Sequence, residues 1–487
     1  MDKYRKNNVI FSGLIWTYME RILADTVSFI VSIILARLLD PEHYGEIAIV
    51  MVFMSIFQVF VTNGFGDIIV QKKEIDDNDI NISFEINVFT SLIIYFLLFL
   101  LAPCIAKFYS TPILQTVIRV MAIRIPISAY NAIQQAYISR NMEFKKFFRA
   151  TLIGTIISAF IGVVLAYKGL GIWALVAQDL SNIFIDTLML SFQIKWKPKL
   201  CFSREKINNT LRYGWKIVAY SLAGAIYDEL RSFLVGKKYT ANKLAFYNFG
   251  KRIPKLVVDN ASNSIGKVLF PVYSKMQDDI EKLQNNIITS VKMELYIITP
   301  MLVGLSIVAP YLIEVAMTDK WLSSVFFVRI FCLCYLFKPI TTTYMQVLRA
   351  LGKNQIILRA QTFIIIINLI VIFISVFAYE SAEAVAYGTL FSTIIGVIVY
   401  MIVISRELTI SFIRQFKVII QHMSYSLIMG AGVYLIKIPT NNLIILCIAK
   451  IVIGVFIYIL LSKVFRINEF SKLITLLKNF KKHREIL

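Results

Sequence analysis

Charged residues are scarce in this chain: Asp, Glu, Lys and Arg make up 17% of the 487 residues, whereas 58% are hydrophobic. A soluble globular domain has about 25% charged and about 45–50% apolar residues. This composition excludes an ordinary soluble domain, because so much apolar surface cannot all be buried in the chain's own core. It favours a lipid bilayer as the place of burial.

Histidine and cysteine are also rare. Three histidines, His43, His422 and His483, and five scattered cysteines exclude a disulfide framework and a histidine-based metal site. No GxxxxGK[ST] phosphate loop occurs, so we expect no nucleotide and no other cofactor. The acidic stretch EIDDNDIN at 74–81 is the one cluster that resembles a metal or nucleotide site, and a solvated loop is the alternative.

Acidic residues number 30 against 51 Lys and Arg, which gives a net charge of +21. The chain has no domain that combines aromatic and basic residues as nucleic-acid readers do, so we expect no nucleic-acid partner. The basic excess is predicted to face anionic membrane lipid.

About fourteen apolar runs are long enough to cross a membrane, which takes about 20 residues each. They lie at 9–37, 43–66, 83–106, 113–138, 148–167, 171–194, 209–236, 242–272, 285–309, 322–348, 356–378, 382–405, 418–436 and 442–463. The first run is longer than the apolar region of a signal peptide and lacks a small-residue cleavage site, which predicts a retained span.

The connections between these runs carry roughly 29 Lys and Arg on one side and about 8 on the other, which predicts that both termini are cytoplasmic. Beyond Arg466, Phe470, Leu473, Leu477 and Phe480 recur at helical spacing among lysines. This pattern is typical of a basic amphipathic helix on the inner leaflet, and a solvated tail is the alternative.

The two halves of the chain resemble each other. The segment NNVIFSGLIW at 7–16 is similar to NNTLRYGWKI at 208–217, with Gly13 and Gly214 in register. Three further pairs recur at nearly the same offset: Pro126 and Pro339, Gln135 and Gln346, and Arg149 and Arg359. Six spans separate the copies, and an even number preserves orientation, so the copies are predicted to be parallel repeats, the layout of alternating-access transporters.

The predicted fold class is therefore an all-α polytopic membrane protein with two parallel six-helix lobes around a central cavity and two extra C-terminal helices. The predicted domains are a first lobe at 1–200, a second lobe at 201–410, two additional spans at 411–463 and the basic tail at 464–487. We expect the chain to act as a monomer.

Ionisable residues inside the spans indicate candidate sites, because each costs about 2.5–3.5 kcal/mol at the bilayer centre. They gather on one face of the seventh span and one face of the eighth, and these faces are predicted to line a water-filled cavity. Snorkelling to the interface is the alternative for the eighth span. The predicted substrate-binding residues on the two faces are Lys216, Tyr220, Tyr227, Arg231, Lys251, Arg252, Lys255 and Asn263.

In the first span, Arg21 lies four residues before Asp25 and beside Glu20, and we predict Arg21 as a further substrate-binding residue. An Arg21–Asp25 pair with a packing role only is the alternative. Glu20, Asp25 and Asp228 are candidate coupling sites for H⁺ or Na⁺, since each lies within a turn of a cation. Their alternative role is to neutralise the neighbouring arginines.

Pro126 and Pro339 are predicted hinges of the fourth and tenth spans, since proline frees a backbone carbonyl. Arg124 and Lys338 lie beside them in the two halves. Each is predicted to be either an ion site at the hinge or one partner of a structural ion pair.

The chain also resembles a known family over most of its length. The segments that carry the resemblance are ARLLDPEHYG (36–45), NGFGDIIVQKK (63–73), APCIAKFYSTP (102–112), FKKFFR (144–149), LAYKGLGIWALVAQ (165–178) and, within 319–355, DKWLSS and LRALGKNQ. They are similar to the oligosaccharide flippase family. More narrowly, they are similar to its branch of lipopolysaccharide and teichuronic acid repeat-unit exporters, within the multidrug, oligosaccharidyl-lipid and polysaccharide exporter superfamily.

The resemblance implies a bacterial inner-membrane protein that moves undecaprenyl-diphosphate-linked oligosaccharide repeat units outward, with glycosyltransferases and a polymerase of the same pathway as partners. The charged faces do not align residue for residue with lipid II flippases, so no arginine role is transferred. The predicted chemistry agrees with this cargo, because Lys and Arg in a water-filled cavity can replace the hydration of a diphosphate. Tyr220, Tyr227, Ser262 and Asn263 could contact its sugar.

Two other functions are open. A cation-coupled drug or metabolite antiporter of the same superfamily would share the fold but favour an acidic or apolar cavity. A membrane glycosyltransferase or polymerase would need a catalytic site on a sizeable loop, whereas the predicted external connections are roughly 4–10 residues long. We therefore expect a transporter and not an enzyme.

Overall fold

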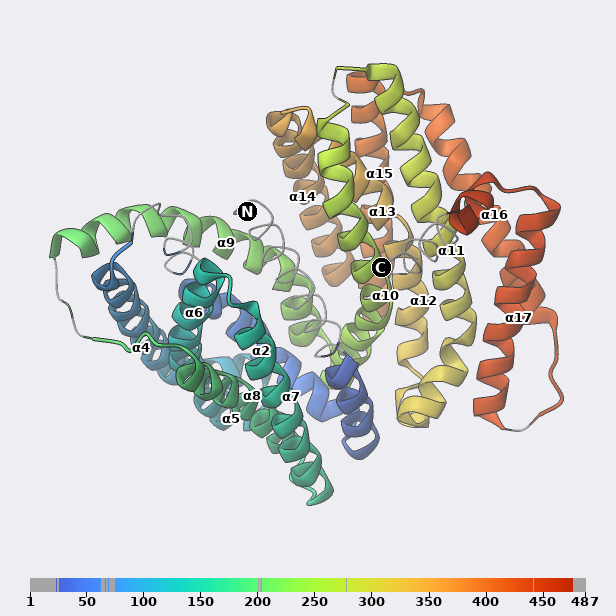
Figure 1. The fold of residues 1–487 in the computed structure, drawn as a ribbon. Helices are drawn as coiled ribbons and strands as arrows, with labels where there is room; N and C mark the ends of the chain where they lie inside the picture. Colours follow the sequence, from blue (N-terminus) through green and yellow to red (C-terminus); the bar gives the residue numbers. More distant parts are fainter. Residues whose placement is uncertain are drawn as a thin grey trace, which may run out of the picture. The chain divides into compact units, whose positions relative to one another are not determined.

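The computed structural model describes residues 26–62, 75–199, 204–276, 278–440 and 442–475, together with positions 23, 66, 69 and 201. These residues form helices and connections, with no strand among them (Figure 1). The first-span candidates Glu20, Arg21 and Asp25 lie outside the described residues. A helix at Thr26–Leu38 follows them.

The helices of the first half are α2 (Pro41–Thr62), α4 (Asp77–Tyr109), α5 (Ile113–Met121), α6 (Arg124–Asn141), α7 (Phe144–Tyr167), α8 (Ile172–Gln193) and α9 (Arg204–Lys238). Those of the second half are α10 (Ala241–Ser274), α11 (Ile280–Met317), η1 (Asp319–Trp321), α12 (Ser324–Leu336), α13 (Lys338–Ala350), α14 (Asn354–Phe377), α15 (Ala382–Leu408), α16 (Phe412–Leu435) and α17 (Leu443–Val464).

Ten helical segments in the described part of the chain are long and apolar enough to cross a membrane, with α5–α6 and α12–α13 each counted as one. Their outward side chains are strongly apolar: Leu100, Phe160 and Phe192 expose 72%, 70% and 77% of their surface. Water would not tolerate so many exposed apolar side chains, whereas lipid does. The prediction of an all-helical, multi-pass membrane protein is confirmed, and the count of fourteen spans stays a prediction.

The chain divides into two compact units, residues 1–245 and 246–487. Helix α9 therefore packs in the first unit, and the predicted lobe boundary at residue 200 stays a prediction. Rings attach it there: Phe233 of α9 packs against Phe53 of α2 and against Phe108 and Tyr109 of α4, with centroids 5.7–6.2 Å apart. The hydroxyl of Tyr109 also donates to the Phe233 carbonyl at 3.2 Å.

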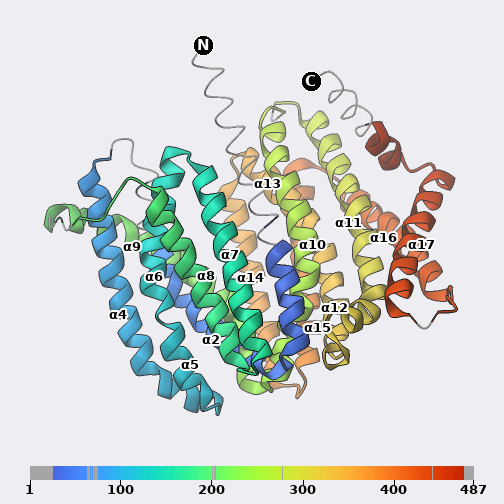
Figure 2. The same cartoon turned by 60° about the horizontal axis from the view of Figure 1, so that its bottom comes forward.

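Helices α7 and α8 lie side by side in the first unit (Figure 2), because small residues line the buried face of α7. These residues, spaced four apart, are Ala150, Gly154, Ser158, Gly162 and Ala166. A Cβ atom at Gly154 would lie 3.2 Å from the Asn182 carbonyl oxygen, and one at Gly162 would lie 2.9 Å from Gln178. Small residues at this spacing allow close approach of membrane helices.

The fourth and tenth spans are broken where the prolines predict. Helix α5 ends at Met121 and α6 begins at Arg124, so Pro126 lies in the first turn of α6. Helix α12 ends at Leu336 and α13 begins at Lys338, so Pro339 follows the break directly. Proline fits a first turn because those N–H groups have no partner in the helix. The hinge role of both prolines stays a prediction.

Helices α4 and α11 contain prolines in their interiors: Pro103 in α4, and Pro300 and Pro310 in α11. Each removes the hydrogen bond of the carbonyl four residues earlier. A side chain from another helix donates to each freed carbonyl, Arg119 to Phe99 at 3.4 Å, Tyr458 to Tyr296 at 2.9 Å and Arg329 to Ser306 at 3.2 Å. Arg119 in α5 and Arg329 in α12 make this contact at corresponding places in the two units, which extends the internal repeat.

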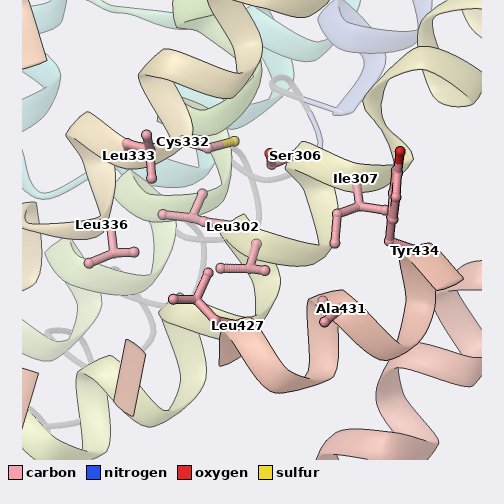
Figure 3. A pocket seen from close by; sticks show the side chains of 11 residues that line it. Leu302, Ser306, Ile307, Cys332, Leu333, Leu336, Leu427, Ala431 and Tyr434 are labelled. Atoms are coloured by element: carbon pink, nitrogen blue, oxygen red, sulfur yellow. The ribbon is translucent and has the colours of Figure 1, made fainter. Parts of the chain in front are cut away.

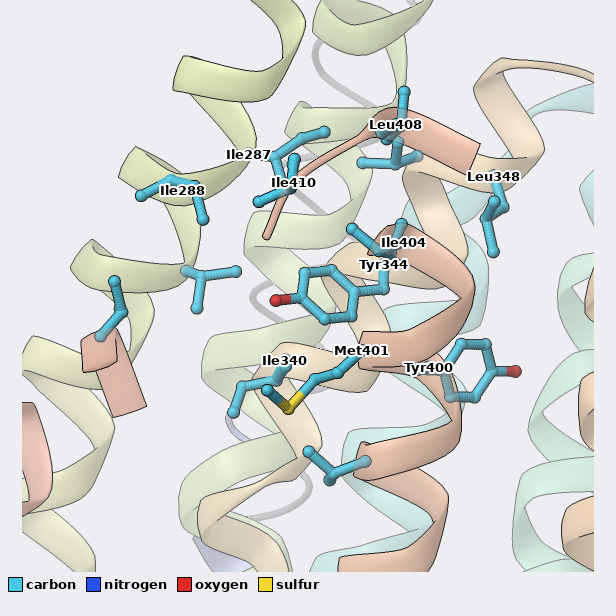
Figure 4. Packing of buried hydrophobic residues seen from close by; sticks show 14 of the residues in the cluster. Ile287, Ile288, Ile340, Tyr344, Leu348, Tyr400, Met401, Ile404, Leu408 and Ile410 are labelled. Carbon is cyan, nitrogen blue, oxygen red and sulfur yellow. The ribbon is translucent and has the colours of Figure 1, made fainter. Parts of the chain in front are cut away.

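A core cluster of the second unit is built from α10, α11, α13, α14, α15 and α16, with side chains including Ile287, Tyr344, Met401 and Ile404 (Figure 4). Helices α16 and α17 pack on α11. Polar contacts fix them there: Tyr296 bonds Ser462 at 2.8 Å, Thr299 bonds Ser426 at 2.8 Å, and the buried Lys450 ammonium donates to the Val433 carbonyl at 2.9 Å.

The predicted amphipathic tail begins as a short helix at 468–475. Ile467 is buried with Tyr296, Met429 and Tyr458, and Phe470 packs against the same cluster. The start of the tail is thus attached to α11, α16 and α17. Residues 476–487 lie outside the described residues, and placement on the inner leaflet stays a prediction.

Candidate functional site

A polar cavity lies inside the first unit, among α2, α6, α7 and α8. Its volume is about 470 Å³. Ten of its fifteen lining residues carry an amide, a hydroxyl or an ionisable group, although α2, α6 and α7 belong to segments that are apolar enough to cross a membrane. We call it the unit 1 polar cavity, and its polar lining residues are Gln58, Thr62, Arg124, Ser128, Asn131, Gln135, Ser139, Thr151, Asn182 and Asp186.

Helical spacing brings these side chains together. Ser128, Asn131, Gln135 and Ser139 follow one another three or four residues apart along α6, so they share a face. On α8, Asn182 and Asp186 are likewise one turn apart. The close approach of α7 and α8 at Gly154 brings α8 within reach of Thr151.

Asp186 is the centre of a hydrogen-bond network in this cavity. Its carboxylate accepts from the Asn131 amide at 2.9 Å and from the Thr151 hydroxyl at 3.3 Å. Asn131 also donates to Thr187 at 3.1 Å and accepts from Gln135 at 2.6 Å. Such fixed amides and hydroxyls can exchange partners with the hydroxyl groups of a sugar.

Arg124 and Asp179 form an ion pair between α6 and α8. One terminal nitrogen of Arg124 lies 2.6 Å from both carboxylate oxygens of Asp179. In the second unit Lys338 of α13 pairs with Asp259 of α10. Arg124 and Lys338 were each predicted to be either an ion site at the hinge or one partner of a structural ion pair. Both contacts fit the ion pair. Asp259 therefore pairs with Lys338 of α13 and not with a cation on the basic face of its own helix.

The predicted basic faces lie on α9 and α10. On α9, Tyr220 is 80% exposed, Asp228 is exposed, and the Arg231 guanidinium lies 5.9 Å from the centre of the Tyr227 ring. On α10, Arg252 and Lys255 are exposed and Lys251 is half-buried. The side chains of Lys216, Ser262 and Asn263 lie outside the described residues.

A second group that the sequence prediction missed is Glu294 of α11, which is 2% exposed. One of its oxygens accepts from the Thr343 hydroxyl at 2.9 Å, and the other has no hydrogen-bond partner among the described residues. Asp186 and Glu294 were not predicted, because neither belongs to a row of charged residues like those on α9 and α10. The polar row on α6 and an acid within an apolar run were the available signals.

The acidic stretch at 74–81 has a structural use. Asp76 caps the first turn of α4, where its carboxylate accepts from the Asp79 N–H at 2.7 Å. Among the described residues no group of three or more His, Cys, Asp or Glu side chains is placed to hold a metal ion.

The described helices and their lipid-exposed apolar surface define a multi-pass, all-helical membrane protein with a polar cavity in its first unit. The chain matches the model of the family described as polysaccharide biosynthesis protein over residues 34–326, and it belongs to that family. The predicted resemblance to polysaccharide exporters is confirmed.

Two curated relatives and one solved structure give the comparison detail. The succinoglycan biosynthesis transport protein ExoT of Rhizobium meliloti (strain 1021) is 21% identical over 278 residues, 57% of this chain and 56% of ExoT, so the chain matches little more than half of that relative. The lipopolysaccharide biosynthesis protein WzxC of Escherichia coli (strain K12) is 21% identical, with 72% of each chain covered. The lipid II flippase MurJ in an inward closed conformation has a TM-score of 0.75 at 17% identity, covering 95% of this chain and 100% of MurJ, which shows a shared fold.

Proposed function

We propose that this protein is a flippase that moves undecaprenyl-diphosphate-linked oligosaccharide repeat units across the bacterial inner membrane for the synthesis of lipopolysaccharide, capsule or exopolysaccharide. The observation that carries the proposal is membership of the polysaccharide biosynthesis family combined with a helical membrane fold like that of MurJ. The name of ExoT, a transport protein of succinoglycan biosynthesis, and that of WzxC, a lipopolysaccharide biosynthesis protein, support a transport role in polysaccharide synthesis.

The proposal includes the full membrane arrangement. Fourteen spans form two parallel lobes and two additional helices, both termini are cytoplasmic, and the lobes alternate access to the two sides. Corresponding breaks at Pro126 and Pro339 and corresponding contacts of Arg119 and Arg329 support the repeat. Such repeats are typical of transporters with a site at the midplane.

Each part of the cargo has a proposed partner. Lys216, Arg231, Lys251, Arg252 and Lys255 hold the diphosphate, with Arg21 as a further member. Cations that are exposed within a membrane-spanning region need an anion or water. The unit 1 polar cavity contacts sugar hydroxyls, and the prenyl tail stays in lipid.

The driving force is proposed to be the membrane potential, worth about 2.3 kcal/mol per charge per 100 mV for an anion that moves outward. Coupling to H⁺ or Na⁺ at Glu20, Asp25 or Asp228 is the alternative. No cofactor and no catalytic step are proposed. Glycosyltransferases and a polymerase supply and consume the cargo, and the protein acts as a monomer.

The test is complementation of a bacterial strain that lacks its own repeat-unit flippase. Lys251→Ala/Lys255→Ala should reduce surface polysaccharide about tenfold or more at normal protein levels, since each charge-assisted contact contributes about 1.5–3 kcal/mol. Lys417→Ala, which removes an exposed lysine from α16, is the matched control. Full complementation by the double variant would contradict the proposed site.

A drug antiporter of the same superfamily is separated from the flippase by binding. Purified protein should bind a polyprenyl diphosphate more tightly than a lipophilic cation, because the proposed site is basic. The opposite preference would favour the antiporter and contradict the flippase.

A further inference from the structure

An apolar groove lies among α11, α12 and α16 in the second unit (Figure 3). Its volume is about 360 Å³, within the range of about 300–1,000 Å³ typical of small-molecule sites. We call it the α16 groove, and its labelled lining residues are Leu302, Ser306, Ile307, Cys332, Leu333, Leu336, Leu427, Ala431 and Tyr434.

Arg329 lies directly beside this groove. It is one turn from Leu333 on α12, and its Nε donates to the carbonyl of Ser306, a lining residue, at 3.2 Å. That carbonyl is the one freed by Pro310, so the proline kink fixes the arginine at the groove. Helices α11 and α16 run toward the predicted outer side, and Arg329 is nearer than Leu333 to that end of α12.

The rest of the Arg329 guanidinium is available to a ligand. Arg329 is exposed, and its described polar contact uses only Nε. Leu322 and Leu333, seven residues before and four residues after Arg329, are exposed and apolar, so the guanidinium lies on an apolar surface of the helix. A cation at such a surface is costly unless an anion pairs with it.

We propose that Arg329 and the α16 groove form a binding site for one anionic phospholipid of the outer leaflet. The terminal N–H groups of Arg329 hold the lipid phosphate, a pairing that the planar guanidinium favours. One acyl chain lies in the groove against Leu302, Leu336 and Leu427. The occupant is a membrane phospholipid, because the positive charge of Arg329 matches a lipid phosphate and the adjacent apolar groove matches an acyl chain.

The first unit supplies a natural control. Arg119 makes the same contact with the carbonyl freed by Pro103 and lies 4.4 Å from the Phe99 ring. The additional helix α16 belongs to the second unit, so the wall that completes the groove is specific to the site at Arg329. Any purely structural effect of removing a kink-capping arginine should appear equally in the two units.

The experiment is native mass spectrometry of the full-length protein released from nanodiscs that contain equal phosphatidylglycerol and phosphatidylcholine. The wild type and Arg119→Gln should retain one phosphatidylglycerol, whereas Arg329→Gln should lose most of it, about tenfold. Ala431→Phe, which fills the groove and leaves Arg329 in place, should lose it too.

Equal retention by Arg329→Gln and the wild type would overturn the proposal, as would equal loss in Arg119→Gln and Arg329→Gln. Retention of phosphatidylcholine in place of phosphatidylglycerol by the wild type would overturn the role of the guanidinium. The measurement needs no transport activity, so its failure is distinguishable from failure of the proposed flippase.

Discussion

Removing one partner of the Arg124–Asp179 ion pair should destabilise the protein much more than removing both partners. The two side chains are 22% and 21% exposed, and they join α6 to α8 through a 2.6 Å contact. Removing one member of a largely buried pair leaves an uncompensated charge and costs about 3–5 kcal/mol. Arg124→Gln and Asp179→Asn should each lower the free energy of unfolding by about that amount.

The double variant Arg124→Gln/Asp179→Asn should lose no more than about 1–2 kcal/mol, because no unpaired charge remains. Unfolding is measured by titrating purified protein in mild detergent with a denaturing detergent and following tryptophan fluorescence. Glu407→Gln is the control, since it breaks the Lys353–Glu407 pair at the ends of two helices and should cost at most about 1 kcal/mol. A double variant that loses the sum of the two single losses would refute the reasoning.

Three further predictions test packing, a buried contact and topology. Gly154→Leu should destabilise the protein by about 1–3 kcal/mol or more in the same titration, because a Cβ there already meets α8, whereas Gly224→Leu, with open space, should not. Thr343→Val should cost about 1–3 kcal/mol, because it removes the hydrogen bond to buried Glu294; no loss would show that the contact is dispensable. Cysteines placed at Ser110 and Lys353 in a cysteine-free chain should react with an impermeant maleimide from outside and inside, respectively, and any exchange of sides would contradict the predicted orientation.

Periodicity and composition predicted the helical membrane fold well, because a membrane helix can be recognised in the sequence as a long apolar run. The runs at 83–106 and 285–309 appear as parts of α4 and α11. The prolines located the breaks before α6 and α13, since the local chemistry of proline decides where a helix can begin.

The unit in which α9 packs was not predictable in the same way. Sequence similarity places a repeat boundary near residue 200, but packing decides which unit a helix joins. Phe233 attaches α9 to α2 and α4 through contacts between residues far apart in the chain. No local pattern in α9 reveals those partners.

The candidate site was predictable only in part. Rows of charge on α9 and α10 are visible in the sequence, but the partner of Asp259 is Lys338, on a different helix. The unit 1 polar cavity combines residues from four helices, and its acid, Asp186, shares α8 with one other ionisable residue, Asp179. Its identification required the three-dimensional arrangement.

The attachment of α17 has a practical consequence for observing transport. The Tyr458 hydroxyl donates to the Tyr296 carbonyl, which lacks its helical hydrogen bond because of Pro300, and the Ser462 hydroxyl bonds the Tyr296 hydroxyl. Helix α17 is therefore attached to α11 at the point where α11 lacks a hydrogen bond of its own. A spectroscopic label on the outer face of α17, for example at the 66% exposed Phe456, should therefore follow the second unit as it moves. The helix pair α16 and α17 thus offers an attachment point for distance measurements that leaves the proposed cargo-binding residues untouched.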